Sequence, residues 1–103
     1  MATFRVIITP RAGKDIEGIH DYVARDSPAN AAAVVKRILD ALEPLKQFPH
    51  RTVVERQSPA LRHPVRSLPV APYIVYFRVL DEDQVVRILS IRHGARRQPR
   101  RFD

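Results

Sequence analysis

The feature that most constrains the fold is a pair of apolar, β-branched runs separated by a short acidic turn. The runs cover residues 73–80 (YIVYFRVL) and 84–91 (QVVRILSI), and three acidic residues stand between them. Runs of this length and composition, joined by a short polar break, are typical of a β-hairpin. Both faces of this hairpin are apolar, so we place it at the heart of a sheet. Tyr73, Val75 and Phe77 alternate onto one face, which we expect to belong to the core.

Two pairs of a hydroxyl residue and a proline predict the starts of two helices. Thr9-Pro10 and Ser27-Pro28 each offer an oxygen that can cap free backbone N–H groups, followed by a proline that suits the first helical position. The connection between the two helices is short, which predicts an antiparallel helical hairpin. The first helix carries one apolar stripe of roughly 120°. Its members are Ala12, Ile16, Ile19, Tyr22 and Val23.

The second predicted helix, from about residue 28 to about residue 48, is apolar over a wider arc than one buried face requires. The arc covers about 180°, whereas a single buried face needs little more than about 100°. Pro44 should kink this helix or end its regular part near Leu42, because proline lacks an N–H and clashes with the preceding turn. The surplus has two explanations: the first helix and a loop cover it within the chain, or a partner covers it.

Three further segments complete the predicted order of elements. Residues 4–9 (FRVIIT) favour a first strand, residues 52–54 a short strand, and residues 65–70 a strand interrupted by Pro69 and hence short or near an edge. The order is β-α-α-β-β-β, with one more short strand as an option. It predicts an α+β domain of two layers, a helical hairpin packed on a mostly antiparallel sheet. The 103 residues fit a single domain, 1–103, whose basic C-terminal tail begins at about residue 92.

Positive charge is concentrated in the second half of the chain. The net charge is +7, and residues 51–103 hold 11 arginines against 5 acidic residues. This balance predicts an acidic partner, either nucleic acid or an acidic protein surface, although a basic solvated surface has the same composition. The main basic group lies on and after the last predicted strand, together with His93. Its arginines are Arg87, Arg92, Arg96, Arg97, Arg100 and Arg101.

The sequence carries no signature of a metal, a cofactor or a nucleophile. It has no cysteine, only three glycines, and four histidines without metal-ligand spacing, so we predict neither a cofactor nor a metal site. No apolar run approaches the ~20 residues that span a bilayer, and the N-terminus lacks a secretory pattern. We therefore expect a cytoplasmic protein. The arginine group can bind phosphates, or it could stabilise a phosphorane-like transition state with His93 as acid or base.

Four segments, taken in order, carry a resemblance that covers nearly the whole chain. They are residues 4–12 (FRVIITPRA), the pair Ser27-Pro28, residues 66–79, and residues 86–96 (VRILSIRHGAR). Together they resemble toxins of the ParE/RelE superfamily, which belong to type II toxin–antitoxin systems. The resemblance implies the same β-α-α-β-β-β fold and a cognate antitoxin protein whose C-terminal segment wraps the helical hairpin in a hetero-oligomer. The contacts expected for it are Val34, Ile38, Leu39 and Leu42.

Two branches of the superfamily differ in the residues they require. RelE-type members cut mRNA in the ribosome, with lysines on a central strand, an arginine directly after the tyrosine of the next strand, and a tyrosine in the tail. Here residues 65–67 (VRS) occupy the lysine region, Ile74 follows Tyr73, and no tyrosine follows Tyr76. Much of the nuclease constellation is therefore missing. The ending at residues 93–96 (HGAR) resembles ParE instead, whose members are typically associated with poisoning DNA gyrase without being enzymes.

We therefore expect a ParE-like toxin of the plasmid-stabilisation type that a cognate antitoxin neutralises and that binds DNA gyrase, with no catalytic residues of its own. The alternatives are a RelE-like ribosome-dependent mRNA endoribonuclease and a non-toxic basic nucleic-acid-binding module. Direct contact with nucleic acid stays open in all three cases. The residues expected to bind the target are Arg87, Arg92, His93, Arg96 and Arg97.

Overall fold

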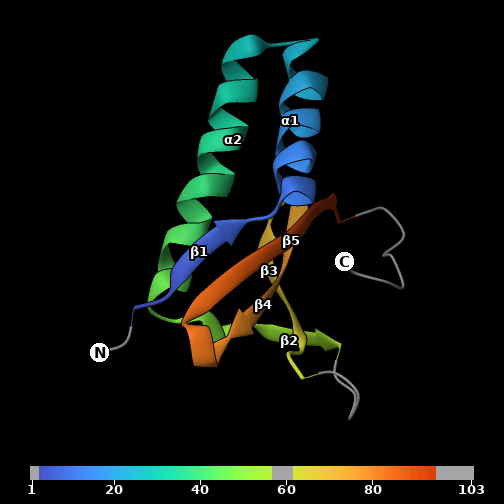
Figure 1. Ribbon diagram of the computed structural model, residues 1–103. Helices are drawn as coiled ribbons and strands as arrows, with labels where there is room; N and C mark the ends of the chain where they lie inside the picture. Colours follow the sequence, from blue (N-terminus) through green and yellow to red (C-terminus); the bar gives the residue numbers. More distant parts are fainter. Residues whose placement is uncertain (1–2, 57–61, 95–103) are drawn as a thin grey trace.

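A helical hairpin covers one face of a β-sheet in the computed structural model of the chain (Figure 1). The structure describes residues 3–56 and 62–94. The hairpin consists of α1 (Pro10–Ala24) and α2 (Pro28–Leu42). In the order of the sheet, the strands are β1 (Arg5–Ile8), β5 (Val85–His93), β4 (Tyr73–Leu80), β3 (Val65–Val70) and β2 (Val53–Arg56). Short 3₁₀ turns are η1 (Glu43–Lys46), η2 (Pro49–Arg51) and η3 (Asp81–Asp83).

Both helices begin where their capping residues predict. The Thr9 hydroxyl accepts a hydrogen bond from the Ala12 N–H at 3.3 Å, and the Ser27 hydroxyl accepts one from the Asn30 N–H at 3.2 Å. The α-helical part of α2 ends at Leu42, and η1, which contains Pro44, follows at once. The predicted effect of Pro44 is thus confirmed. In the described part of the chain, no helix is both long and apolar enough to cross a membrane.

The sheet is mostly antiparallel, as predicted, and the optional short strand is present as β2. Only β1 runs parallel to its neighbour among the described strands, and its last residue, Ile8, lies beside Ile88 of β5. The predicted hairpin is β4–β5, with a bulge where the register changes between Tyr76 and Phe77. Strand β5 continues past Ile91 to His93. The residues expected to open the C-terminal tail are therefore strand residues.

The core lies between the helices and one face of the sheet, which we call the helix face. Val75 and Phe77 of β4 are fully buried there, and Tyr73 packs against them from a half-buried position, as the alternation predicts. Ala12 of α1 and Ile38 of α2 are the fully buried helical members of the same cluster. The opposite face, which we call the outer face, carries a second and smaller buried cluster. Its members are Val65, Tyr76 and Leu89.

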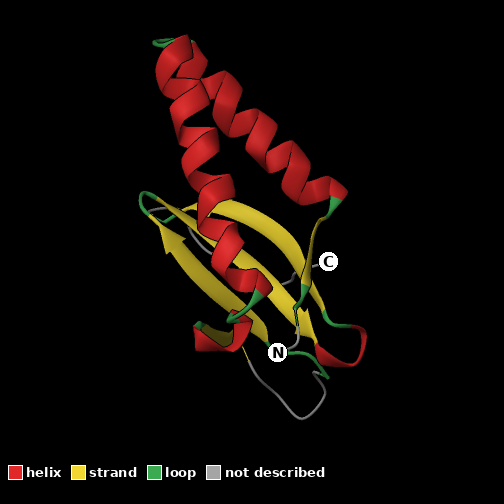
Figure 2. Cartoon of the chain, turned by 90° about the vertical axis from the view of Figure 1, so that its left-hand side faces the viewer, coloured by secondary structure: helices red, strands yellow, loops and turns green. Residues whose placement is uncertain are grey.

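Tyr22 departs from the predicted apolar stripe of the first helix. Its side chain is 68% exposed, whereas Ile16 and Ile19 of the same stripe pack against the core. The tip of the helical hairpin projects beyond the edge of the sheet (Figure 2). Tyr22 lies near that tip, so helical periodicity places it on the correct side of α1 but outside the core.

Candidate functional site

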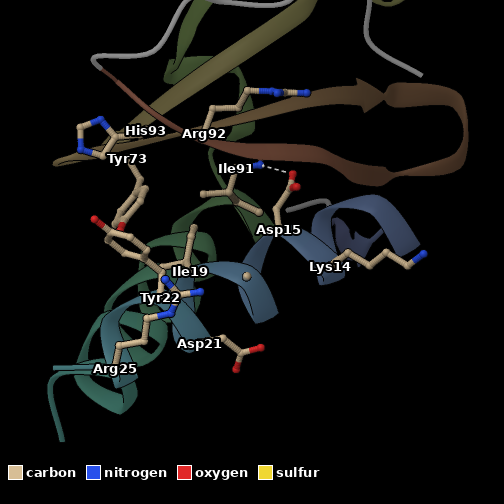
Figure 3. Close-up of a pocket in the computed structure, with 11 residues that line it drawn as sticks. Lys14, Asp15, Ile19, Asp21, Tyr22, Arg25, Tyr73, Ile91, Arg92 and His93 are labelled. Carbon is tan, nitrogen blue, oxygen red and sulfur yellow. Dashed lines mark hydrogen bonds between the residues drawn. The ribbon is translucent and has the colours of Figure 1, made fainter. Parts of the chain in front are cut away.

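The end of β5 presents two of the predicted target-binding residues on opposite faces of the sheet. His93 lies beside Tyr73 in the register, and the two rings contact edge to face with centroids 5.6 Å apart. Arg92 lies beside Ile74 on the outer face. Figure 3 shows the Arg92 side chain leaving β5 on the side away from α1, while Ile91 points toward the helix. The alternation of a strand therefore separates these neighbours in sequence.

Of the other three predicted target-binding residues, the structure describes only Arg87. Arg87 is exposed and lies on the outer face, directly opposite Arg78 of β4. Arg87 and Arg92 thus share one face, and His93 belongs to the other. Arg96 and Arg97 lie outside the described residues.

A carboxylate of α1 holds the end of β5 in place. Strand β1 ends at Ile8, and beyond that point α1 takes its position along the edge of β5. There the Asp15 carboxylate accepts a hydrogen bond from the Ile91 N–H at 3.0 Å, and the Thr9 hydroxyl donates one to the Ile88 carbonyl at 2.7 Å. Sequence patterns did not indicate this role for Asp15, because its partner is a backbone N–H on a distant strand.

Removing the Asp15 carboxylate should destabilise the fold at this edge. Asp15→Ala leaves a partly buried Ile91 N–H without its acceptor, and we expect a loss of about 1–3 kcal/mol in the free energy of unfolding. Asp15→Asn keeps an acceptor oxygen and should lose less. Urea unfolding measures both variants, and hydrogen exchange should be faster at the Ile91 amide. Equal stability of Asp15→Ala and the parent would show that this contact does not hold the strand end.

A groove of about 760 Å³ runs between α1 and the ends of β4 and β5 (Figure 3). Tyr22, Ile19 and Tyr73 give it an apolar and aromatic wall. The Arg25 guanidinium lies 5.9 Å from the centre of the Tyr22 ring. Exposed tyrosine beside arginine is a combination that is enriched in protein interfaces. The remainder of the groove wall is charged or polar. It is formed by Lys14, Asp15, Asp21, Arg92 and His93.

The outer face also carries a buried phenol. Tyr76 lies opposite Ser90 in the register, and only 3% of it is exposed. Burial raises the pKa of the Tyr76 hydroxyl, and the nearby Glu55 carboxylate raises it further. Glu55 in turn accepts a hydrogen bond from the Ser67 hydroxyl at 2.6 Å. The phenol therefore stays neutral at physiological pH, where it can form hydrogen bonds but is not a base.

The four residues expected to bind the antitoxin do not share one surface. Ile38 and Leu42 are buried in the core at 0% and 4% exposure, and Val34 is half-buried against it. Leu39 is 40% exposed. A second groove, between α1 and α2, includes Val35 in its wall. The wide apolar arc of α2 thus divides into a side that packs on the sheet and a side that stays accessible.

A family model and a curated relative each match nearly the whole chain. Residues 6–98 match the family described as "ParE toxin of type II toxin-antitoxin system, parDE". The chain is 31% identical over 101 residues to a Sinorhizobium fredii protein named "Putative toxin Y4kP", covering 96% of this chain and 97% of the relative.

Solved structures of toxin–antitoxin systems share the fold. A chain of the chromosomal ParDE system from P. aeruginosa is 26% identical, with a TM-score of 0.71 and coverage of 90% of this chain and 98% of that one. The RelBE2 toxin–antitoxin complex of Mycobacterium tuberculosis contains a chain that is 25% identical, with a TM-score of 0.60 and coverage of 88% and 98%. The archaeal RelE–RelB complex of Pyrococcus horikoshii OT3, at 19% identity and a TM-score of 0.65, matches 92% of this chain and 99% of that one and is similar in fold alone.

Proposed function

The chain belongs to the ParE toxin family of type II toxin–antitoxin systems, and on that premise we propose that it binds DNA gyrase in the cytoplasm and is silenced by a cognate antitoxin. The family match over residues 6–98 carries the proposal. The solved relatives include a ParDE system and RelBE complexes, which supports a protein antitoxin as the partner. The mode of action we propose is binding and not catalysis.

We assign target binding to the basic end of the sheet. Arg87 and Arg92 lie on the outer face of the sheet. His93 lies on the helix face, where it lines the groove between α1 and the ends of β4 and β5. Arg96 and Arg97 follow a few residues later in the sequence. Among the described residues, no carboxylate forms an ion pair with Arg87 or Arg92. Unpaired guanidinium groups are suited to carboxylates of a protein or to phosphates.

We assign antitoxin binding to the accessible side of the helical hairpin. Leu39 is exposed there, and Val35 is half-buried and lines the groove between α1 and α2, whereas Val34 is half-buried against the core. An amphipathic partner segment that lays apolar side chains into such a groove is a common mode of peptide recognition. Ile38 and Leu42 contribute to this surface only by supporting it from the core.

Two assays on purified protein test the proposed target. In the first, the toxin acts on gyrase with supercoiled DNA, and we expect inhibition that the antitoxin reverses. In the second, it acts on translating ribosomes, and we expect intact mRNA. Site-specific cuts in mRNA together with unaffected gyrase would refute gyrase binding and support a ribosome-dependent endoribonuclease.

The double variant Arg92→Ala with Arg96→Ala should abolish toxicity at equal expression. Each charge-assisted contact contributes about 1.5–3 kcal/mol, so the loss of two should weaken target binding at least about a hundredfold. Cell growth after induction measures the effect. The control is Arg11→Ala with Lys36→Ala, which removes the same charge from exposed positions of the two helices, outside the groove that contains Arg92 and His93. Toxicity that persists in the first variant, or that is lost equally in both, would contradict the assigned surface.

A further inference from the structure

The groove between α1 and the ends of β4 and β5 has a floor that no side chain fills. Gly18 lines this groove, and a Cβ atom added to it would meet no atom within 4 Å beyond its own turn of helix. The backbone of Gly18 is helical, so its conformation does not require glycine. The groove holds about 760 Å³, within the ~300–1,000 Å³ that is typical of ligand-binding clefts. It therefore has room for a ligand that approaches α1 closely.

Two tyrosine rings enter this groove from different elements. Tyr22 reaches it from α1 and Tyr73 from β4 (Figure 3). Tyr22 is 68% exposed, whereas Tyr73 is half-buried, with the His93 ring in edge-to-face contact. Tyrosine is among the residues that contribute most to binding at interfaces. The two rings thus offer apolar area to a side chain from outside the chain.

The charges of the groove favour a ligand with several negative groups. Among the described residues, Lys14 and Arg25 take part in no ion pair. The carboxylates of the groove have partners within the chain: Asp15 accepts from a backbone N–H of β5, and Asp21 lies 3.2 Å from the imidazole of His20. Eleven positions of helix separate the two cations, which corresponds to about 16 Å at ~1.5 Å per residue. A small anion cannot reach both, but a peptide with several carboxylates can.

We propose that this groove binds an acidic peptide segment that carries one bulky apolar side chain. The apolar side chain lies between Tyr22 and Tyr73. Carboxylates that flank it in the peptide meet Lys14 on one side and Arg25 on the other. The site is distinct from the groove between α1 and α2 that we assign to the antitoxin, and it does not depend on gyrase being the target.

The direct test is binding of a short fluorescently labelled peptide, one leucine flanked by glutamates and aspartates, to the full-length chain, measured by anisotropy. Gly18→Glu should weaken binding at least about tenfold, because the new side chain fills the floor and opposes the peptide with like charge. The matched control is Gly13→Glu, which makes the same change in the same helix outside the groove, at a position that is equally open. It should leave the affinity nearly unchanged. Both variants replace a helical glycine, so neither should lower the thermal midpoint.

Further variants separate the apolar part of the site from the charged part. Tyr22→Ala should weaken binding about tenfold or more, and replacing the leucine of the peptide by serine should do the same to the parent chain. Lys14→Gln with Arg25→Gln should weaken binding only several-fold, because exposed charge contacts are individually weak, and should make it less sensitive to salt.

Equal weakening by Gly18→Glu and Gly13→Glu would mean that net charge alone attracts the peptide, and it would overturn the site. A lysine-rich peptide with the same central leucine that binds equally well would refute the acidic ligand. An oligodeoxynucleotide that binds more tightly than the peptide and is lost in Gly18→Glu would replace the peptide by nucleic acid. A parent dimer in sedimentation that Gly18→Glu dissociates would assign the groove to a second copy of the chain.

Discussion

Replacing Phe77 by alanine is expected to lower the free energy of unfolding by about 3–5 kcal/mol. Phe77 is fully buried and lies opposite Ile88 in the central strand pair, where it packs in the cluster that joins the sheet to the helices. The truncation removes apolar contacts and leaves a cavity that a tightly packed core cannot close. Domains of this kind are stable by only about 5–15 kcal/mol. Urea unfolding followed by circular dichroism should therefore show a large fall in the midpoint.

Phe48 provides the matched control for this measurement. It is the same residue type but is 38% exposed, and its ring faces the Arg51 guanidinium at 4.1 Å. Phe48→Ala is expected to change the free energy of unfolding by no more than about 1 kcal/mol. If Phe77→Ala does not fold at all, Phe77→Leu, which retains most of the apolar volume, should give a smaller and measurable loss. An unchanged midpoint in Phe77→Ala would show that the helix face of β4 is not the core.

Two neighbouring residues of α2 are expected to respond in opposite ways to the same substitution. Ile38→Ala should cost about 2–5 kcal/mol of stability and leave the antitoxin affinity of the folded protein unchanged, because Ile38 is fully buried against the sheet. Leu39→Ala should change stability by about 0.5 kcal/mol or less, because its side chain is 40% exposed. If the antitoxin covers this side of the hairpin, Leu39→Ala should weaken its binding about tenfold or more.

Urea unfolding gives the stability of each variant, and calorimetric titration with the antitoxin gives the affinity. The two substitutions serve as controls for each other, since both remove apolar atoms from adjacent positions of one helix. An antitoxin affinity that falls for Ile38→Ala in the folded protein and not for Leu39→Ala would show that the partner reaches the opposite side of α2. Unchanged affinity in both would remove this part of the hairpin from the interface.

Local chemistry determined the elements of this protein. Thr9 and Ser27 cap the helices as predicted, because capping involves a side chain and backbone N–H groups a few residues away. Pro44 ends the regular part of α2 through a clash within its own turn. The alternation in β4 assigned Val75 and Phe77 to the core, because side chains on a strand point to opposite faces. The order of these elements was sufficient for the two-layer α+β fold.

The tertiary structure decided which of these faces meet. Periodicity shows that α2 is apolar over a wide arc, but the packing of two layers determines that Ile38 lies under the sheet and Leu39 does not. Contacts between strands depend on register, and the register of β4 and β5 shifts at a bulge that the sequence does not indicate. For this reason Arg87 lies on the same outer face as Arg92, although strict alternation over five positions would place the two on opposite faces. The Asp15 contact has the same origin, since a hydrogen bond to a strand 76 positions away arises from the packing of layers and not from any local pattern.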